Sequence, residues 1–385
     1  MTRNFLALDF GGGEIVAALA AVDEETNSLR VRYAVRHKSR AFCGSLVRDI
    51  DEAQRELSLL FSEIFKYVSV NPVVVIGLRG TFLSFKQEMG FKSIESRNRI
   101  ISKRDIEAAL NNAIPPHKRE TLEVVDILPQ VFTIDGASGI KKPLGYEGFC
   151  LEVETFVSYA LITHLNNFNR IISSVGCEEY QIIPSAIALG ETLAKPEEKR
   201  AGVLVLDIGE TLTSAIMYHK EILTDAWELP TGLDIRTQAL AELLQCDEET
   251  AREELQNYEI GTDSLIDETL ENATEKMLYN IKTQLIQTSM FYLNHPSNQI
   301  ILCGAAADKT MLKLCKKVFS ARKARLGGYE HLISDCNLEN PAYTGALSLL
   351  HHALDREEKH LGIAQAKESG FLDGILDKLG LGQLF

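Results

Sequence analysis

The chain has 385 residues, of which 45% are apolar and 24% are charged, and its formal net charge is −14. This length predicts two or three domains, and the composition is that of a folded globular protein. The acidic balance argues against nucleic-acid binding, which relies on Lys and Arg to neutralise phosphates. The seven cysteines are dispersed without a CxxC pair, which argues against a disulfide framework or a zinc site. No apolar run predicts a signal peptide or a membrane-spanning helix.

The first motif is the stretch LDFGGGEIVA at residues 8–17. An apolar run that predicts a strand ends at Asp9, and three glycines follow. Glycine accepts positive φ at no steric cost, so the glycines predict a tight turn. The pattern is neither the dinucleotide fingerprint GxGxxG nor the phosphate loop GxxxxGK[ST]. The segment IVAALAAV after Glu14 suits a helix or a strand, and we interpret it as a strand by analogy with a second copy of the motif.

This second copy occupies residues 203–219, VLVLDIGETLTSAIMYH. Its strand ends at Asp207, its turn begins at Gly209, and the alternating segment after Thr211 predicts a return strand. Two matched hairpins predict an internal duplication with a cleft between the halves. Backbone N–H groups of facing turns can bind a polyphosphate, and the two aspartates would hold Mg²⁺ through water.

A third element is IILCGAAADKTMLKL at residues 300–314, which predicts a buried strand followed by a helix. The small residues between them, Gly304, Ala305 and Ala306, would let a flat base lie close to the backbone. Tight packing between strand and helix is the other interpretation, and for this segment alone it is the better one.

These three elements, in this order, resemble those of the actin/Hsp70/sugar-kinase ATPase superfamily. The middle of the chain resembles the small inserted domain of the bacterial cell-division family FtsA. The matching segments are Ser102 with Asp105-Ile106, Ala113-Ile114-Pro115-Pro116, Leu128-Pro129-Gln130, Ile134-Asp135-Gly136, and Gly139-Ile140 before Pro143 and Gly145. Three further segments resemble the FtsA connecting helix, the start of its second small domain and its closing helix, respectively 182–193, 229–244 and 340–353. By this resemblance, which covers nearly the whole chain, the protein is identified as a member of the FtsA family.

The resemblance implies an α/β fold: an actin-like (ribonuclease H-like) duplicated core with two small inserted subdomains, the first an SHS2 domain of the FtsA type. The first large subdomain would span 1–82 with 163–195 and 340–356, and the SHS2 domain would span 83–160. The second large subdomain would span 196–229 with 297–339, around a second small subdomain at 230–296. A linker at 357–369 and an amphipathic helix at 370–385 would follow.

Members of this family bind ATP, polymerise head to tail, bind the C-terminal tail of the tubulin-like division protein FtsZ, and attach to the inner membrane by a C-terminal helix. The resemblance therefore implies a division-site scaffold on the cytoplasmic side of the inner membrane, with ATP or ADP and Mg²⁺ as ligands. No catalytic residue is assigned, and ATP turnover is expected to be weak or absent. Three alternatives stay open: a nucleotide-free pseudo-ATPase adaptor of the same family, a PilM-type pilus-assembly adaptor, and a phosphotransferase of the sugar-kinase branch.

The sequence departs from the family pattern in the segments that should contact nucleotide. Glu14 stands where the family has a lysine, Glu210 replaces a glycine, and Gln256 replaces a lysine three residues after Glu253. Glutamates in these turns would repel phosphate, so we expect nucleotide binding to be retained but weak. The resemblance places the nucleotide site at Asp9, Gly11, Gly12, Gly13, Glu14, Asp207, Gly209, Glu210, Thr211, Gly232, Glu253, Gln256, Gly304, Ala305 and Ala306, with Mg²⁺ held through water at Asp9 and Asp207.

The predicted FtsZ-tail site also departs from the family. The family carries an arginine on a helix of the second small domain, whereas residues 275–294 here contain Lys276 and Lys282 and no arginine. Binding of the tail is therefore implied by the family and not by these residues.

The last residues, GFLDGILDKLGLGQLF at 370–385, predict an amphipathic helix after a polar linker. Its apolar residues would bind a lipid surface, although interfacial helices are usually richer in Lys and Arg. The alternative is that the helix docks on the protein or on a partner. The residues expected to contact the membrane are Phe371, Leu372, Ile375, Leu376, Leu379, Leu384 and Phe385.

Overall fold

The computed structural model describes residues 3–23, 28–68, 72–115, 120–177, 179–329 and 332–361. The predicted terminal helix at 370–385 lies outside the described residues, as does most of the predicted linker at 357–369. Within the described ranges, no helix combines the length and the apolar character needed to cross a bilayer.

The first half of the core is a sheet of six strands in the order β11-β6-β1-β2-β3-β17. β1 lies between antiparallel β2 and parallel β6, and β2 confirms the strand predicted after Glu14. Helices α1 and α3 cover one face of this sheet, and α11 covers the other. The strands are β1 (Asn4–Phe10), β2 (Glu14–Asp23), β3 (Ser28–Lys38), β6 (Val73–Leu78), β11 (Gln181–Pro184) and β17 (Ile333–Ser334), and the helices are α1 (Ile50–Ile64), α3 (Ile162–Ser174) and α11 (Thr344–Leu361).

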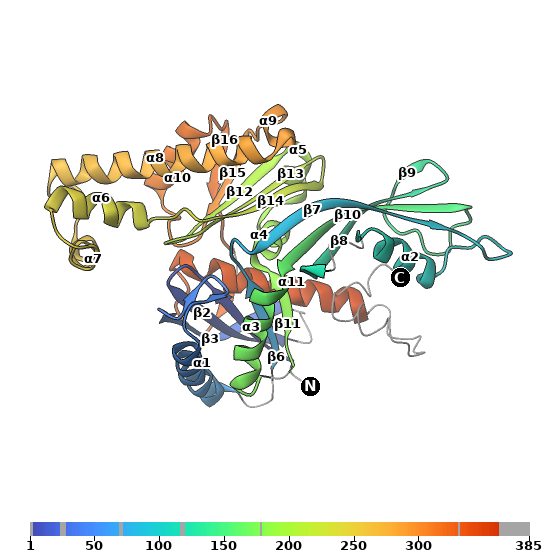
Figure 1. The fold of residues 1–385 in the computed structure, drawn as a ribbon, viewed down its shortest axis with the longest axis horizontal. Helices are drawn as coiled ribbons and strands as arrows, with labels where there is room; N and C mark the ends of the chain where they lie inside the picture. The colour runs from blue at the N-terminus through green and yellow to red at the C-terminus, as the bar shows by residue number, and fades with distance from the viewer. Residues whose placement is uncertain are drawn as a thin grey trace.

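The second half repeats the plan of the first. Its sheet has the order β14-β13-β12-β15-β16, in which β12 lies between antiparallel β13 and parallel β15. Helices α8 and α10 cover its outer face, and α4 packs between the two sheets (Figure 1). The predicted duplication is thereby confirmed. The elements are β12 (Val203–Ile208), β13 (Thr213–His219), β14 (Ile222–Leu229), β15 (Gln299–Cys303), β16 (Lys323–Leu326), α4 (Ser185–Leu193), α5 (Pro196–Ala201), α8 (Ser264–Thr288), α9 (Met290–Asn294) and α10 (Lys309–Val318).

One boundary differs from the sequence interpretation, which assigned residues up to 339 to the second half. β17, at residues 333–334, pairs with β3 at the edge of the first sheet. The ion pair between Arg30 and Asp335 lies beside this pairing. β17 pairs with a strand that lies far from it in the sequence, and no local sequence pattern predicts such a pairing.

The inserted domain is an antiparallel sheet, β7-β10-β8-β9, with α2 packed on one face. A capping box between Ser102 and Asp105 starts α2, and Gly90 lets this helix lie against β7. The domain extends to one side of the core, opposite the second small domain formed by α6, α7 and the first turns of α8 (Figure 1). The elements are β7 (Leu83–Ser93), α2 (Lys103–Asn112), β8 (Leu122–Ile134), β9 (Ala137–Ile140), β10 (Cys150–Leu161), α6 (Asp234–Leu244) and α7 (Glu248–Asn257); short elements elsewhere are β4 (Phe42–Cys43), β5 (Leu46–Val47), η1 (Phe65–Tyr67) and η3 (Pro341–Tyr343).

The inserted domain contacts both halves of the core. Toward the second half, the Gln130 side chain on β8 bonds twice to the backbone of Leu223 on β14: its Nε2 donates to the carbonyl at 3.0 Å, and its Oε1 accepts from the N–H at 2.6 Å. Toward the first half, Arg356 on α11 pairs with the buried carboxylate of Asp126 at 2.7 Å. The inserted domain therefore bridges the two halves at a place away from the hairpins.

This bridge predicts a measurable effect of Gln130→Ala. The change removes both bonds and leaves the N–H and C=O of the buried Leu223 unpaired, so we expect the free energy of unfolding to fall by about 2 kcal/mol. The control is Gln87→Ala, because Gln87 makes one longer bond, 3.3 Å, to the carbonyl of Thr224 on the same strand. Denaturant unfolding of both variants should show a larger loss of unfolding free energy for Gln130→Ala than for Gln87→Ala. Equal losses would contradict this prediction.

Candidate functional site

The two strand-end aspartates face each other because of strand periodicity. Along β1, Leu6 and Leu8 point toward α1 and α3, so Asp9 shares the opposite face with Phe5 and Ala7. Along β12, Leu204 and Leu206 likewise point outward, so Asp207 shares the inner face with Val203 and Val205. Both carboxylates are buried in the layer between the two sheets.

Glycines make room for these carboxylates. A Cβ atom on Gly345, at the start of α11, would lie 1.9 Å from Asp9 Oδ2. A Cβ atom on Gly304 would lie 1.9 Å from Asp207 Oδ1, and Gly304 has a φ of +83°. Asp9 Oδ1 also accepts a hydrogen bond from Ser185 Oγ at 2.8 Å. The nearby Asp207 carboxylate and the positive φ at this position therefore both require a glycine at 304.

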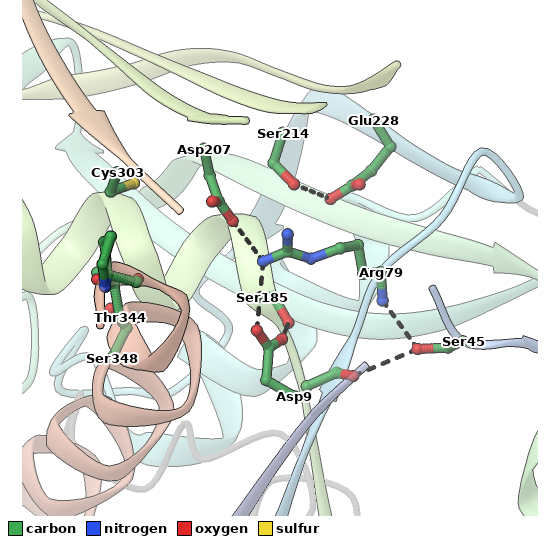
Figure 2. Close-up of polar contacts among 12 residues, drawn as sticks. Asp9, Ser45, Arg79, Ser185, Asp207, Ser214, Glu228, Cys303, Thr344 and Ser348 are labelled. Carbon is green, nitrogen blue, oxygen red and sulfur yellow. Dashed lines mark hydrogen bonds and ion pairs between the residues drawn. The ribbon is translucent and has the colours of Figure 1, made fainter. Parts of the chain in front are cut away.

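The guanidinium of Arg79 lies between the two carboxylates (Figure 2). Arg79 directly follows β6 of the first sheet, and its Nη2 is 2.6 Å from Asp207 Oδ2 of the second half and 3.6 Å from Asp9 Oδ2. Only 4% of the residue is exposed. Ser45, in the β4–β5 hairpin, fixes the Arg79 backbone, because Ser45 Oγ accepts from the Arg79 N–H and the Ser45 N–H donates to the Arg79 carbonyl. From the sequence, we expected Mg²⁺ between Asp9 and Asp207.

The two glycine turns touch one another directly. Each turn is closed by the same bond, from the Gly11 N–H to the Glu14 carbonyl in the first and from the Gly209 N–H to the Leu212 carbonyl in the second. Thr211 Oγ1 donates to the Gly12 carbonyl at 3.1 Å, and a Cβ atom on Gly12 would lie 2.2 Å from that hydroxyl. The facing turns are therefore in direct contact at Gly12 and Thr211. We call this contact, together with Asp9, Arg79 and Asp207, the turn junction.

The two unexpected glutamates have different surroundings. Glu14 Oε2 accepts from Arg36 Nε at 2.9 Å, since β2 and β3 pair side by side. Glu210 has a raised pKa, because its neighbours partly exclude water from the carboxyl and Asp234 lies close by. The loop around Gly232 covers the second turn, with the Asp234 N–H donating to the Glu210 carbonyl at 2.8 Å. The carboxylate of Glu14 is therefore paired with the positive charge of Arg36.

The remaining predicted residues are spread over a wider region. Ala306 is buried and its N–H donates to the Ile208 carbonyl, whereas Ala305 is exposed. Gly13 has open space beside it. Glu253 and Gln256 are exposed on α7, a helix that packs on α6. The structure thus brings together Asp9, Gly11, Gly12, Asp207, Gly209, Thr211 and Gly304, and leaves the others at the margin of the turn junction.

A further acid lies near Arg79. Glu228 on β14 accepts a hydrogen bond from Ser214 at 2.9 Å, and its Oε2 is buried. Burial raises the pKa of Glu228 to about 8, although the nearby Arg79 lowers it. Burial also raises the pKa of Asp207, against the opposing effect of Arg79. Burial therefore favours the protonated form of Glu228, and the single positive charge of Arg79 faces the two carboxylates of Asp9 and Asp207.

Sequence reasoning missed Arg79, Ser185, Ser45 and Glu228. A signal for Arg79 existed: the apolar run VVVIGL at 73–78 ends directly in an arginine. A charge at the carboxyl end of a buried parallel strand lies at the same sheet edge as the neighbouring strand end. The register of β6 against β1, which pairs Gly77 with Asp9, is what brings the two together.

The residues of the turn junction do not fit a Mg²⁺–nucleotide pair. A guanidinium stands where the cation was expected, and the turns that should hold phosphates are in contact. Among the described residues, no group of three or more His, Cys, Asp or Glu side chains could hold a metal ion. Weak nucleotide binding stays a prediction that this geometry does not support.

Comparisons with known proteins agree with the fold. The family model "SHS2 domain inserted in FTSA" matches residues 80–158. The cell division protein FtsA of Streptococcus pneumoniae is 23% identical over 390 residues, which covers 95% of this chain and 83% of that protein. A PilM-PilN type IV pilus biogenesis complex has a TM-score of 0.64 at 16% identity, covering 91% of this chain and 98% of that chain. MreB5 of Spiroplasma citri, bound to ADP, has a TM-score of 0.50 at 12% identity, covering 94% and 98%. The resemblance to FtsA and the actin-like fold with its SHS2 domain are thereby confirmed.

Removing the central cation should be costly. Arg79→Met keeps the side-chain stem but leaves two buried carboxylates without a counter-charge, so we expect a loss of about 3–5 kcal/mol in the free energy of unfolding. The control is Arg36→Met, which breaks the partly exposed pair with Glu14 and should cost about 1 kcal/mol or less. Denaturant unfolding at one pH measures both, and a small loss for Arg79→Met would contradict a buried ion pair.

Glu228 predicts a pH dependence of stability. The folded protein keeps this proton up to about pH 8, whereas the unfolded chain loses it near the ordinary pKa of 4.5. Stability from this group is therefore present below pH 4.5 and lost as pH rises to about 8, by at most about 1.4 kcal/mol per pH unit. The neutral side chain in Glu228→Gln does not titrate, so the unfolding free energy of the wild type should fall relative to that of the variant from pH 5 to 8. A difference that stays constant across this range would contradict the raised pKa.

Proposed function

We propose that this divergent relative of the FtsA cell-division proteins is a division scaffold that works by assembly and tethering. In this role it self-assembles head to tail, binds the FtsZ tail and holds it at the cytoplasmic face of the inner membrane as a peripheral protein. The similarity to FtsA over 95% of the chain supports this proposal.

The observation that carries the proposal is the inserted domain. A domain of the FtsA type follows β6 directly, at residues 80–158, and bonds to the second half through Gln130 and to α11 through Asp126. An enzyme of the sugar-kinase branch would need a polar substrate pocket at the turn junction, where the turns instead touch. The geometry therefore supports a scaffold over a phosphotransferase.

Of the two forms of the scaffold, the turn junction supports the nucleotide-free one. The buried pair of Arg79 with Asp207 supplies a positive charge between the strand-end aspartates without a bound ion. The contact between Thr211 and Gly12 closes the turns without phosphate. Neither ATP nor Mg²⁺ is needed for the arrangement of these residues.

The second small domain offers a place for an acidic tail. Lys282 donates to the Val318 carbonyl at 2.7 Å and so helps to hold α10, whereas Lys276 on the same helix is exposed. A pocket of about 340 Å³ in this domain has an apolar part from α6 and α8, formed by Leu240, Leu244 and Ile266. Glu254 also lines this pocket and Lys276 lies outside the lining, so we infer that acidic residues of the tail contact Lys276 and that its apolar residues contact the pocket.

A second candidate is a pilus-assembly adaptor of the PilM type, favoured by the TM-score of 0.64 to the PilM-PilN complex. At 16% identity that likeness concerns the fold alone. The two candidates differ in what they bind. A division scaffold should bind an FtsZ tail peptide, whereas a pilus adaptor should not.

The test uses the full chain with an FtsZ tail peptide and with vesicles of phosphatidylglycerol and phosphatidylethanolamine. We expect micromolar peptide binding that weakens about tenfold in Lys276→Glu, because a like charge replaces an attraction. Lys313→Glu on α10 is the matched control for net charge. We also expect co-sedimentation with vesicles that is lost on deleting residues 370–385. Absence of peptide binding would reject the division scaffold, and vesicle binding that survives the deletion would reject the tether.

A further inference from the structure

We infer that Arg79 is a built-in cation that replaces the metal ion of an actin-like site and keeps the two halves closed without any ligand. The inference rests on the proposed function, because it names how the core of such a scaffold is held in one conformation. The evidence lies in the charges, the direction of the arginine, and the contacts around it.

The charges require a cation at this point. Asp9 and Asp207 are both at least 95% buried and face the same layer between the sheets. Two carboxylates in such surroundings repel each other strongly, and burial makes each charge costly. A guanidinium cannot lose its proton, so it supplies a permanent positive charge that no change in metal concentration can remove.

The direction of Arg79 makes the pair a link between the halves. Its backbone belongs to the first half, where Ser45 holds it by two hydrogen bonds. Its shorter ion pair, 2.6 Å, is with Asp207 of the second half, and its longer one, 3.6 Å, is with Asp9 of its own sheet. Separation of the halves would therefore break the shorter pair and leave Arg79 with only its longer pair to Asp9.

Neighbouring contacts across the turn junction also hold the two halves together. Thr211 of the second half donates to the Gly12 carbonyl of the first and lies 3.6 Å from Cys43 Sγ. Leu212 packs toward Gly44 in the same β4–β5 hairpin, which holds Ser45. The hairpin that fixes Arg79 thus also contacts the opposite turn. One closed arrangement satisfies all of these contacts.

The contact between Cys43 and Thr211 provides a direct assay of closure. In Thr211→Cys, a thiol replaces the hydroxyl beside Cys43, and mild oxidation should form a cross-link between the halves. We expect this cross-link to form at the same rate in EDTA and with millimolar Mg²⁺ and ATP. In Arg79→Met with Thr211→Cys, we expect it to form at least about tenfold more slowly, because the open state gains population. Cys43→Ser with Thr211→Cys is the control that excludes the other cysteines.

Three results would overturn the inference. One is a cross-link in the Thr211→Cys protein that needs ATP or Mg²⁺, which would mean that ligand closes the halves. Another is an unchanged rate of cross-linking after loss of the arginine. If Arg79→Met does not fold, Arg79→Lys replaces it in this assay. This variant keeps the charge but lacks the forked guanidinium, so it should slow the cross-linking less. A thermal midpoint of the wild-type protein that rises with Mg²⁺ and ATP would also reject it. None of these readouts involves FtsZ or vesicles, so a closed core that binds neither would reject the proposed function alone.

Discussion

The ion pair of Arg79 with Asp207 is the interaction on which the rest of the turn junction depends. Two buried, charged aspartates at the ends of strands in neighbouring sheets repel each other, and a positive charge between them offsets that repulsion. The glycines at 304 and 345 leave room for the carboxylates, and Ser45 holds the arginine backbone in place. The contact between the turns follows from this, since the turns can meet only when the strands that carry them are held together.

This pair is better explained by conformational specificity than by net stability. Burying a charge costs free energy that its partner returns only in part, and apolar residues of the same volume often stabilise as well or better. Arg79 Nε and Glu228 Oε2 are buried without hydrogen-bond partners among the described residues, which adds to the cost. What such a pair does provide is a strong penalty for any arrangement in which the halves separate.

The sequence predicted the parts of the site that lie within one hairpin and missed those that depend on pairing between distant strands. The turns at Gly11 and Gly209 and the positions of Asp9 and Asp207 follow from local patterns of apolar residues and glycine. The place of Arg79 depends instead on the register of β6 with β1, and the neutralisation of Glu14 by Arg36 depends on the pairing of β2 with β3. Both depend on pairing between strands, which no single segment of the sequence predicts.

The duplication shows that one of two equivalent positions carries the cation. Gly77 pairs with Asp9 in the first half, and Cys303 pairs with Asp207 in the second, so these two positions are equivalent. Two residues further on, the first half has Arg79 and the second has Ala305, which is small and exposed. The layer between the sheets therefore holds one guanidinium against two aspartates. Burial raises the pKa of Glu228 and so favours its neutral form, and one guanidinium shared between two carboxylates joins the halves. An actin-like fold can therefore hold its closed form without nucleotide through a single side chain at the carboxyl end of β6, directly before the inserted domain that also bridges the two halves.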